Sequence, residues 1–204
     1  MTGDIAFLGY GQLYTLIGPL TAAFKPAEGL LAGIWFLPAV LAALLVRKPG
    51  AALLAEMVAA VLSMLLGSQW GWGTAVSGLM QGGGVELAFL LTRYRRFTLP
   101  VAVLGGVLSA LLEWGWEKVA YYQEMSWAFS GTMLAFFLLS GALLCGVLGW
   151  AASRALIATG AVAMLTPLKS TEPFVIRVDR TTGAVDVVRG LSAEDGPVHY
   201  DEAV

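Results

Sequence analysis

Three polar side chains lie inside long apolar runs of this sequence, namely Glu56, Gln81 and Glu86. A charged residue near the centre of a membrane helix costs about 2.5–3.5 kcal/mol, so it is kept where it faces a polar interior or acts on a ligand. Gly82, Gly83 and Gly84 stand between the amide and the second carboxylate and leave room for a ligand or a neighbouring helix. These residues can hydrogen-bond to a small polar guest. In an alternative interpretation, a protonated Glu86 is hydrogen-bonded to a facing helix.

Aromatic residues and acids gather in two further segments, "LGSQWGWGT" and "LLEWGWEKVAYYQEMSW", and Trp35 lies in an earlier apolar run. Their members are Trp70, Trp72, Glu113, Trp114, Trp116, Glu117, Tyr121, Tyr122 and Trp127. An aromatic belt at the membrane interface would account for the rings alone. Acids beside the rings suit a flat cationic ligand, which stacks on aromatic faces and is attracted to them through cation–π contacts.

The motifs of common enzymes are missing from the sequence. It has no G-x-x-x-x-G-K-[ST] loop, so the glycine run at residues 82–84 is not a phosphate cradle and no ATPase site is expected. It has no H-E-x-x-H motif, and its single histidine, His199, lies in a polar C-terminal segment. The two isolated glutamates have no metal-ligand spacing. We therefore expect neither a catalytic set nor a metal or cofactor.

The elements that position these residues are predicted to be membrane helices. The chain is 58% hydrophobic and 13% charged, with a mean hydropathy of +0.76, whereas soluble domains carry about 25% charged residues. Apolar runs lie at about 5–23, 29–46, 50–66, 73–92, 99–114 and 131–153, close to the roughly 20 residues that cross a bilayer core. Open strand edges would leave backbone groups unsatisfied in lipid. The predicted fold is an all-α, polytopic bundle of six transmembrane helices, and Pro38 predicts a kink in the second.

Two regions are expected along the chain. Residues 1–168 form the transmembrane domain, and residues 169–204 form a polar tail in which "FVIRVDRTTGAVDVVRG" is typical of a small β-hairpin. The basic residues Arg47, Lys48, Arg93, Arg95, Arg96 and Arg154 fall on one side if the helices alternate, with Lys25 and Lys118 on the other. Because cytoplasmic loops carry the Lys/Arg excess, we expect a multi-pass protein of the cell membrane with both termini in the cytoplasm.

Several motifs in order resemble one transporter family. They are "GIWFLPAVLAALLVRKPGAALLAEMVAAVLSMLLGS", then "SGLMQGGGVELAFLLTRYRR" and "LLSGALLCGVLG". Together they are similar to the substrate-binding S components of energy-coupling factor (ECF) transporters, and within these to the YkoE-like group associated with thiamine or its hydroxymethylpyrimidine precursor. Trp35, Glu56, Gln81 and Glu86 match the family's motif positions. The polar tail is longer than the family pattern.

The resemblance implies a six-helix subunit that captures a vitamin at its outer face. It also implies uptake in partnership with a transmembrane scaffold subunit and two cytosolic ABC ATPases. A carboxyl group would pair with the aminopyrimidine edge, rings would sandwich the flat ligand, and a second acid would balance the thiazolium cation. The candidate substrate-binding residues are Trp35, Glu56, Gln81, Glu86, Trp72, Glu113, Trp116 and Tyr121.

Two other interpretations stay open from the sequence. In the first, the chain is a structural or regulatory membrane protein whose acids pair between helices, since Glu56 and Glu86 each lie about seven residues from a basic cluster. In the second, the two carboxylates serve an intramembrane enzyme, although nothing in the sequence supplies a nucleophile. Replacing Glu86 with Gln separates the first interpretation from vitamin capture, because it should lower stability in one case and affinity in the other.

Overall fold

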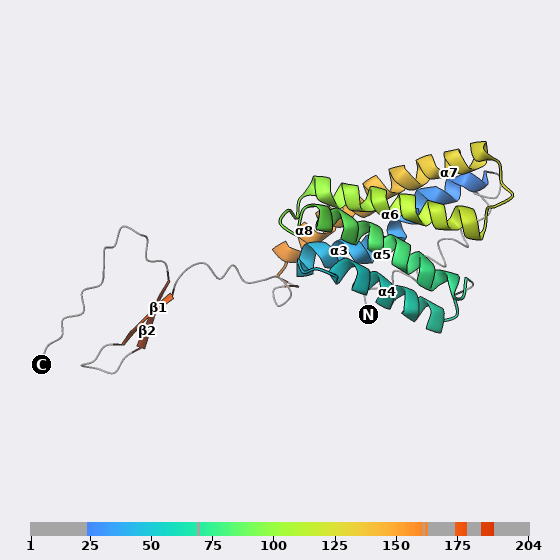
Figure 1. The fold of residues 1–204 in the computed structure, drawn as a ribbon. Helices are drawn as coiled ribbons and strands as arrows, with labels where there is room; N and C mark the ends of the chain where they lie inside the picture. Colours follow the sequence, from blue (N-terminus) through green and yellow to red (C-terminus); the bar gives the residue numbers. More distant parts are fainter. Residues whose placement is uncertain (1–23, 69, 161, 163–173, 179–184, 190–204) are drawn as a thin grey trace, which may run out of the picture. The chain divides into compact units, whose positions relative to one another are not determined.

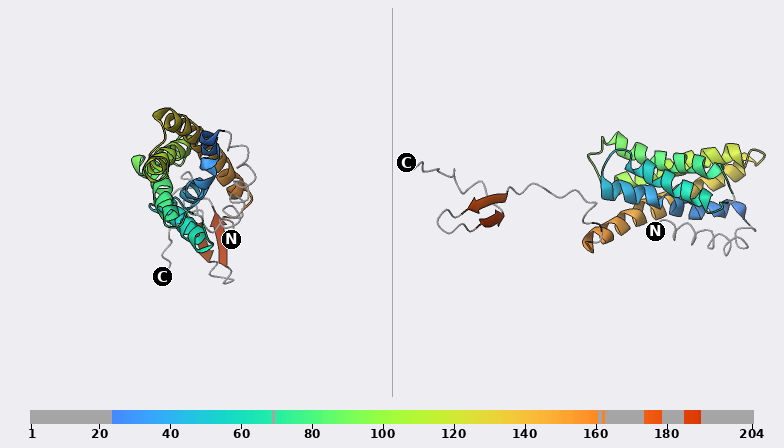
Figure 2. Two further views of the ribbon diagram at one scale, coloured as in Figure 1. Left: turned by 90° about the vertical axis from the view of Figure 1, so that its right-hand side faces the viewer. Right: turned by 90° about the horizontal axis from the view of Figure 1, so that it is seen from below.

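The computed structural model describes residues 24–68, 70–160, 162, 174–178 and 185–189. The chain divides into two compact units, residues 1–166 and residues 167–204, and each is considered by itself. Within the first unit the structure describes a bundle of helices that run side by side (Figures 1 and 2). Within the second it describes two strands.

The described helices follow the apolar runs. They are η1 (Lys25–Leu31), α2 (Ala32–Trp35), α3 (Leu37–Val46), α4 (Ala51–Leu65), α5 (Gly73–Leu91), α6 (Leu99–Ala120), α7 (Trp127–Ser140), η2 (Gly141–Leu148) and α8 (Gly149–Ala158). When helices that follow one another without a break are counted as one, the described residues contain four helices long and apolar enough to cross a membrane. Helix α4 is a shorter apolar helix of 15 residues. The prediction of an all-α membrane fold is confirmed. The first predicted run, 5–23, lies outside the described residues.

The outer surface of α4 and α5 is apolar. Leu54, Leu65 and Leu91 are 67%, 78% and 65% exposed. Such a surface would be costly in water and is suited to lipid, where apolar side chains face hydrocarbon. The fully buried residues include Phe36 and Val85, both with a relative exposure of 0%. The core therefore lies on the sides of these helices that face one another.

The second predicted helix is interrupted where Pro38 predicts a kink. Helix α2 ends at Trp35, and α3 begins at Leu37 with the proline in its first turn. A proline has no N–H to donate and clashes with a helix that runs through it, so the two halves are separate elements. The interruption leaves the N–H of Ala39 without a helical acceptor, and it donates instead to Oε2 of Glu56 on α4, at 3.1 Å.

The fifth predicted run is longer than expected. Helix α6 continues through Ala120, so the expectation that the chain leaves the helix at Trp114 is wrong. The residues from Leu112 to Ala120 include no proline, and a single glycine within a helix costs only about 1 kcal/mol. The next helix also begins earlier than predicted, at Trp127, because Ser126 caps it by accepting a hydrogen bond from the Phe129 N–H at 3.2 Å.

Helices α5 and α6 approach each other closely at a glycine, Gly84, near the residues of the binding site described below. A Cβ added at Gly84 on α5 would overlap the backbone of Ser109 on α6. The Ser109 hydroxyl donates to the carbonyl of Gln81 at 2.5 Å. Small residues of this kind allow helix backbones to approach closely in lipid. The approach brings Gln81, one turn before Gly84, and Glu113, one turn after Ser109, into the same region.

The second unit contains a short antiparallel pair of strands. Strand β1 (Phe174–Val178) pairs with β2 (Val185–Arg189), in a register that places Phe174 opposite Arg189 and Val178 opposite Val185. The strands coincide with the two β-branched runs on either side of the Thr-Thr-Gly turn in the sequence.

Candidate binding site

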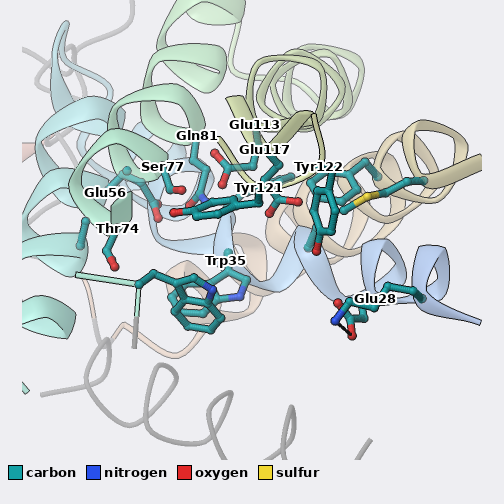
Figure 3. A pocket seen from close by; sticks show the side chains of 18 residues that line it. Glu28, Trp35, Glu56, Thr74, Ser77, Gln81, Glu113, Glu117, Tyr121 and Tyr122 are labelled. Atoms are coloured by element: carbon teal, nitrogen blue, oxygen red, sulfur yellow. Dashed lines mark ion pairs between the residues drawn. The ribbon is translucent and has the colours of Figure 1, made fainter. Parts of the chain in front are cut away.

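A cavity of about 270 Å³ opens at one end of the bundle. Its wall is built by η1, α2, α4, α5, α6 and α7 and by residues that lie between helices, and Figure 3 shows the side chains that line it. The lining residues are Lys25, Glu28, Ala32, Trp35, Phe36, Glu56, Ala60, Trp70, Thr74, Ser77, Gly78, Gln81, Glu113, Glu117, Tyr121, Tyr122, Met133 and Phe137.

Two buried carboxylates lie in this lining. Glu56 on α4 is 1% exposed and Glu113 on α6 is 3% exposed. Glu56 accepts the hydrogen bond from Ala39 described above. Ser77 and Gln81 of α5 lie within hydrogen-bonding reach of Glu113, yet its Oε2 has no hydrogen-bond partner among the residues the structure describes. A buried acceptor without a partner is costly and is satisfied when a ligand brings a donor or a cation.

Two more acids lie in the lining. Glu117 follows Glu113 by one helical turn on α6, and Glu28 of η1 forms an ion pair with Lys25 at 3.0 Å. The described lining thus carries four carboxylates and one lysine. Because acids outnumber the lysine, the lining favours a cationic or hydrogen-bond-donating ligand and disfavours an anionic one.

Aromatic rings complete the wall. Trp35 and Trp70 meet edge to face, with ring centroids 6.0 Å apart and an interplanar angle of 87°. Tyr121, directly after α6, meets Trp116 in a similar way at 6.3 Å and 79°. Partial burial raises the pKa of the Tyr121 phenol, and the nearby Glu113 and Glu117 carboxylates raise it further. The phenol is therefore protonated at neutral pH and can donate a hydrogen bond.

The structure brings together five of the eight side chains predicted from the sequence. Trp35, Glu56, Gln81, Glu113 and Tyr121 all line the cavity. They come from α2, α4, α5, α6 and the residue that follows α6, so no short segment of the chain contains the site.

The other three predicted side chains lie outside the cavity lining. Trp72 precedes α5 and is 82% exposed. Trp116 lies behind Tyr121, with its ring edge against the tyrosine. Glu86 lies at the opposite end of α5 from Gly73, where that helix approaches the turn between α3 and α4.

Glu86 caps the start of α4. Its Oε1 accepts from the Gly50 N–H at 2.5 Å, and its Oε2 accepts from the Ala52 and Leu53 N–H groups at 3.1 and 3.3 Å. The Tyr94 hydroxyl also donates to Oε1, at 2.6 Å. Burial, followed by this bond to the carboxylate, raises the pKa of Tyr94 to about 12. Negative charge at a helix N-terminus is stabilising, so this arrangement is one of helix capping.

Sequence reasoning left several lining residues outside its candidate set. Glu117 was visible in the acid- and aromatic-rich segment, but only a continuous helix places it one turn after Glu113 on the same side. Ser77 was also left out, and it precedes the candidate Gln81 by the same i, i+4 spacing on α5. Glu28 precedes an apolar run, and its place in the wall depends on how η1 packs beside α7.

An all-helical membrane bundle with a polar cavity among its helices is the architecture of a membrane subunit that binds a small molecule. The fold is similar to a solved structure described as an S component of an ECF transporter, with a TM-score of 0.73 and 36% identity, over 79% of this chain and 83% of that one. The HMP/thiamine permease protein YkoE of Bacillus subtilis (strain 168) is 39% identical over 158 residues, 76% of each chain. A family model for the permease component of an ABC-type cobalt transport system matches residues 2–112. The chain belongs to the YkoE family of ECF transporter S components, as its motifs predict.

The C-terminal part of the chain has different relatives. A family model for the VirB8 protein matches residues 137–204. The type IV secretion system protein virB8 of Bartonella quintana (strain Toulouse) is 57% identical over 44 residues, which are 22% of this chain and 18% of that protein. This chain thus spans less than a fifth of the virB8 protein, and the similarity is limited to that stretch.

Among the described residues, no group of three or more His, Cys, Asp and Glu side chains could hold a metal ion. The four acids of the cavity come from η1, α4 and α6.

Proposed function

We propose that this S component captures thiamine or its hydroxymethylpyrimidine precursor from outside the cell. The observation that carries the proposal is the cavity itself, in which buried Glu56 and Glu113 face the same space as Trp35 and Trp70. The name of the Bacillus subtilis relative, HMP/thiamine permease, supports this choice of ligand.

The chemistry of the cavity suits both rings of thiamine. An aminopyrimidine offers N–H donors, for which the unpartnered Oε2 of Glu113 is an acceptor. The thiazolium carries a permanent positive charge, which the remaining carboxylates balance, and the indole rings of Trp35 and Trp70 offer faces for stacking. Hydroxymethylpyrimidine has no thiazolium ring, so it would use only the hydrogen-bond acceptors of the cavity.

The cavity lies at the outer face in this proposal. Its wall includes the start of η1, the start of α5 and the end of α6, whereas Arg47, Lys48 and Arg93 follow the opposite ends of α3 and α5. Figure 1 shows these turns at the other end of the bundle. Because basic loops are retained in the cytoplasm, the basic end faces inward, and so do both chain termini.

The partners follow from the family. The sequence has no Walker A loop, so we infer that ATP hydrolysis comes from two cytosolic ABC ATPases through a transmembrane scaffold subunit. The S component would then supply selectivity and the partners the energy. Transport of labelled thiamine in vesicles that contain the scaffold and ATPases, compared with vesicles that contain this chain alone, tests the division.

A calorimetric titration tests the ligand. The full chain in detergent should bind thiamine, and Glu113→Gln should weaken the affinity at least about tenfold, because a charge-assisted hydrogen bond contributes about 1.5–3 kcal/mol. Glu124→Gln is the matched control, since Glu124 is an exposed acid in the loop after α6 and does not line the cavity. Failure of the wild type to bind either compound would overturn the proposal, as would full affinity in Glu113→Gln.

A further inference from the structure

Tyr121 occupies a particular place in the wall of the cavity. It is the first residue after α6, and its N–H still donates to the carbonyl of Glu117 at 2.8 Å. It lines the cavity, and it is 46% exposed. Figure 3 shows the ring among the labelled cavity side chains.

The hydroxyl of Tyr121 reaches the beginning of α5. A Cβ built on Gly73, the first residue of that helix, would overlap the Tyr121 hydroxyl oxygen. The ring therefore extends from the end of α6 to the start of α5, and both of these helix ends contribute residues to the cavity lining, Glu117 and Thr74. Position 73 accommodates the hydroxyl because glycine has no side chain.

Neighbouring groups hold the ring in this place. Trp116, one turn earlier on α6, packs its edge against Tyr121. Lys118 fixes the chain that follows, since its ammonium group donates to the carbonyls of Tyr122 and Met125 at 2.8 and 2.7 Å. A ring supported in this way has one preferred orientation across the rim.

We propose that Tyr121 is a kinetic barrier at the mouth of the cavity, and that Gly73 is the residue that lets it close. The inference rests on the proposed function, because it concerns how a captured ligand enters and leaves. A barrier slows both association and dissociation. It differs in this from a contact with the ligand, whose loss raises the dissociation rate alone.

Gly73→Ala is the variant that tests this most directly. The added methyl group takes the position of the Tyr121 hydroxyl, and the ring must swing away from the rim. Alanine is a better helix former than glycine by about 1 kcal/mol, so α5 itself is not weakened. Gly83→Ala is the matched control on the same helix, because an added Cβ there meets nothing within 4 Å.

The measurement is stopped-flow tryptophan fluorescence on the full chain in detergent, with thiamine as the probe and Trp35 and Trp70 as reporters in the cavity wall. In Gly73→Ala the association and dissociation rate constants should both rise, each by about tenfold, while the dissociation constant changes much less. Gly83→Ala should keep the rates of the wild type. Thermal unfolding of each variant verifies that it is folded.

Two substitutions at position 121 make the test independent of how Gly73→Ala folds. Tyr121→Ala removes the ring and should raise both rates as Gly73→Ala does, and the double variant should show no further increase because both changes act on one contact. Tyr121→Phe keeps the ring, so both rate constants should rise less than in Tyr121→Ala.

Unchanged rates in Tyr121→Ala, or a rise in dissociation alone, would overturn the barrier while thiamine capture stands. If the wild type binds neither thiamine nor hydroxymethylpyrimidine in the equilibrium titration, the proposed function fails and the barrier with it.

Discussion

The two ends of the bundle use the same side chain in opposite ways. At one end, Glu86 of α5 is surrounded by donors, with three backbone N–H groups and the Tyr94 hydroxyl directed at its two oxygens. At the other end, Glu113 of α6 is buried beside a cavity and keeps one oxygen without a partner among the described residues. A carboxylate whose acceptors are filled by its own protein holds the fold, whereas a carboxylate in a cavity lining with one acceptor unfilled can turn that oxygen to a ligand.

Glu56 combines features of both ends. It accepts from the Ala39 N–H in the first turn of α3, as Glu86 accepts from the first turn of α4. Each acid therefore caps the helix that precedes its own. Glu56 also lines the cavity, which Glu86 does not. The comparison predicts that the three acids respond differently to substitution, with stability affected at one end and affinity at the other.

The largest effect on stability is expected for Glu86→Ala. The change leaves the N–H groups of Gly50, Ala52 and Leu53 without their acceptor, which should lower the free energy of unfolding by about 2 kcal/mol. Thermal denaturation of the full chain in detergent measures this loss, with exposed Glu124→Ala as the control. Thiamine affinity of the folded fraction should stay within about twofold of the wild type. An unchanged melting temperature with reduced affinity would reverse the roles assigned to the two ends.

Glu56→Gln should have the opposite effect, with lower thiamine affinity and an unchanged melting temperature. The amide oxygen of glutamine can still accept from Ala39, so the cap on α3 and the melting temperature are retained. The cavity loses one acid and its acceptor for a ligand donor, which should weaken thiamine binding by about tenfold. Calorimetric titration beside a melting curve distinguishes the outcomes. A variant that melts earlier but binds normally would show that Glu56 acts only as a cap.

The membrane fold could be predicted from the sequence because length and apolarity determine which segments cross a bilayer. The helix boundaries were harder to predict. The fifth apolar run predicts a helix that ends at Trp114, yet α6 continues to Ala120. Only a continuous helix explains why Glu113 and Glu117 share one wall.

The partner of Glu86 could not be predicted from the sequence. Its place within an apolar run predicts either a polar interior or a ligand. Which groups contact Glu86 depends on how the turn at Gly50 packs against α5, some 36 residues away in the chain. Tertiary packing of this kind leaves no local pattern, so a ligand and a capped helix are equally good explanations of the same acid.

The pH dependence of stability sharpens the comparison at the Glu86 end. The pKa of Tyr94 is about 12 in the folded chain, above the value of about 10 for an unfolded tyrosine. A raised pKa contributes stability that is fully present below pH 10 and is lost as the pH rises toward 12. Tyr94→Phe should therefore show a shallower decline in unfolding free energy over this window, measured by denaturant titration. Equal slopes in the two proteins would argue against the bond between Tyr94 and Glu86.

The smallest effect is expected for Trp72→Ala. Trp72 directly precedes α5, and the residues two positions before and after it, Trp70 and Thr74, both line the cavity. Its side chain is 82% exposed and does not line the cavity, so its removal costs neither packing nor a ligand contact. Thiamine affinity should remain within about twofold. Trp70→Ala is the matched comparison, because that ring lies in the wall against Trp35 and its loss should weaken binding several-fold. If the two variants lost affinity equally, the ligand would have to lie further out than the cavity between α4, α5 and α6, and the contrast between the acids would need a different explanation.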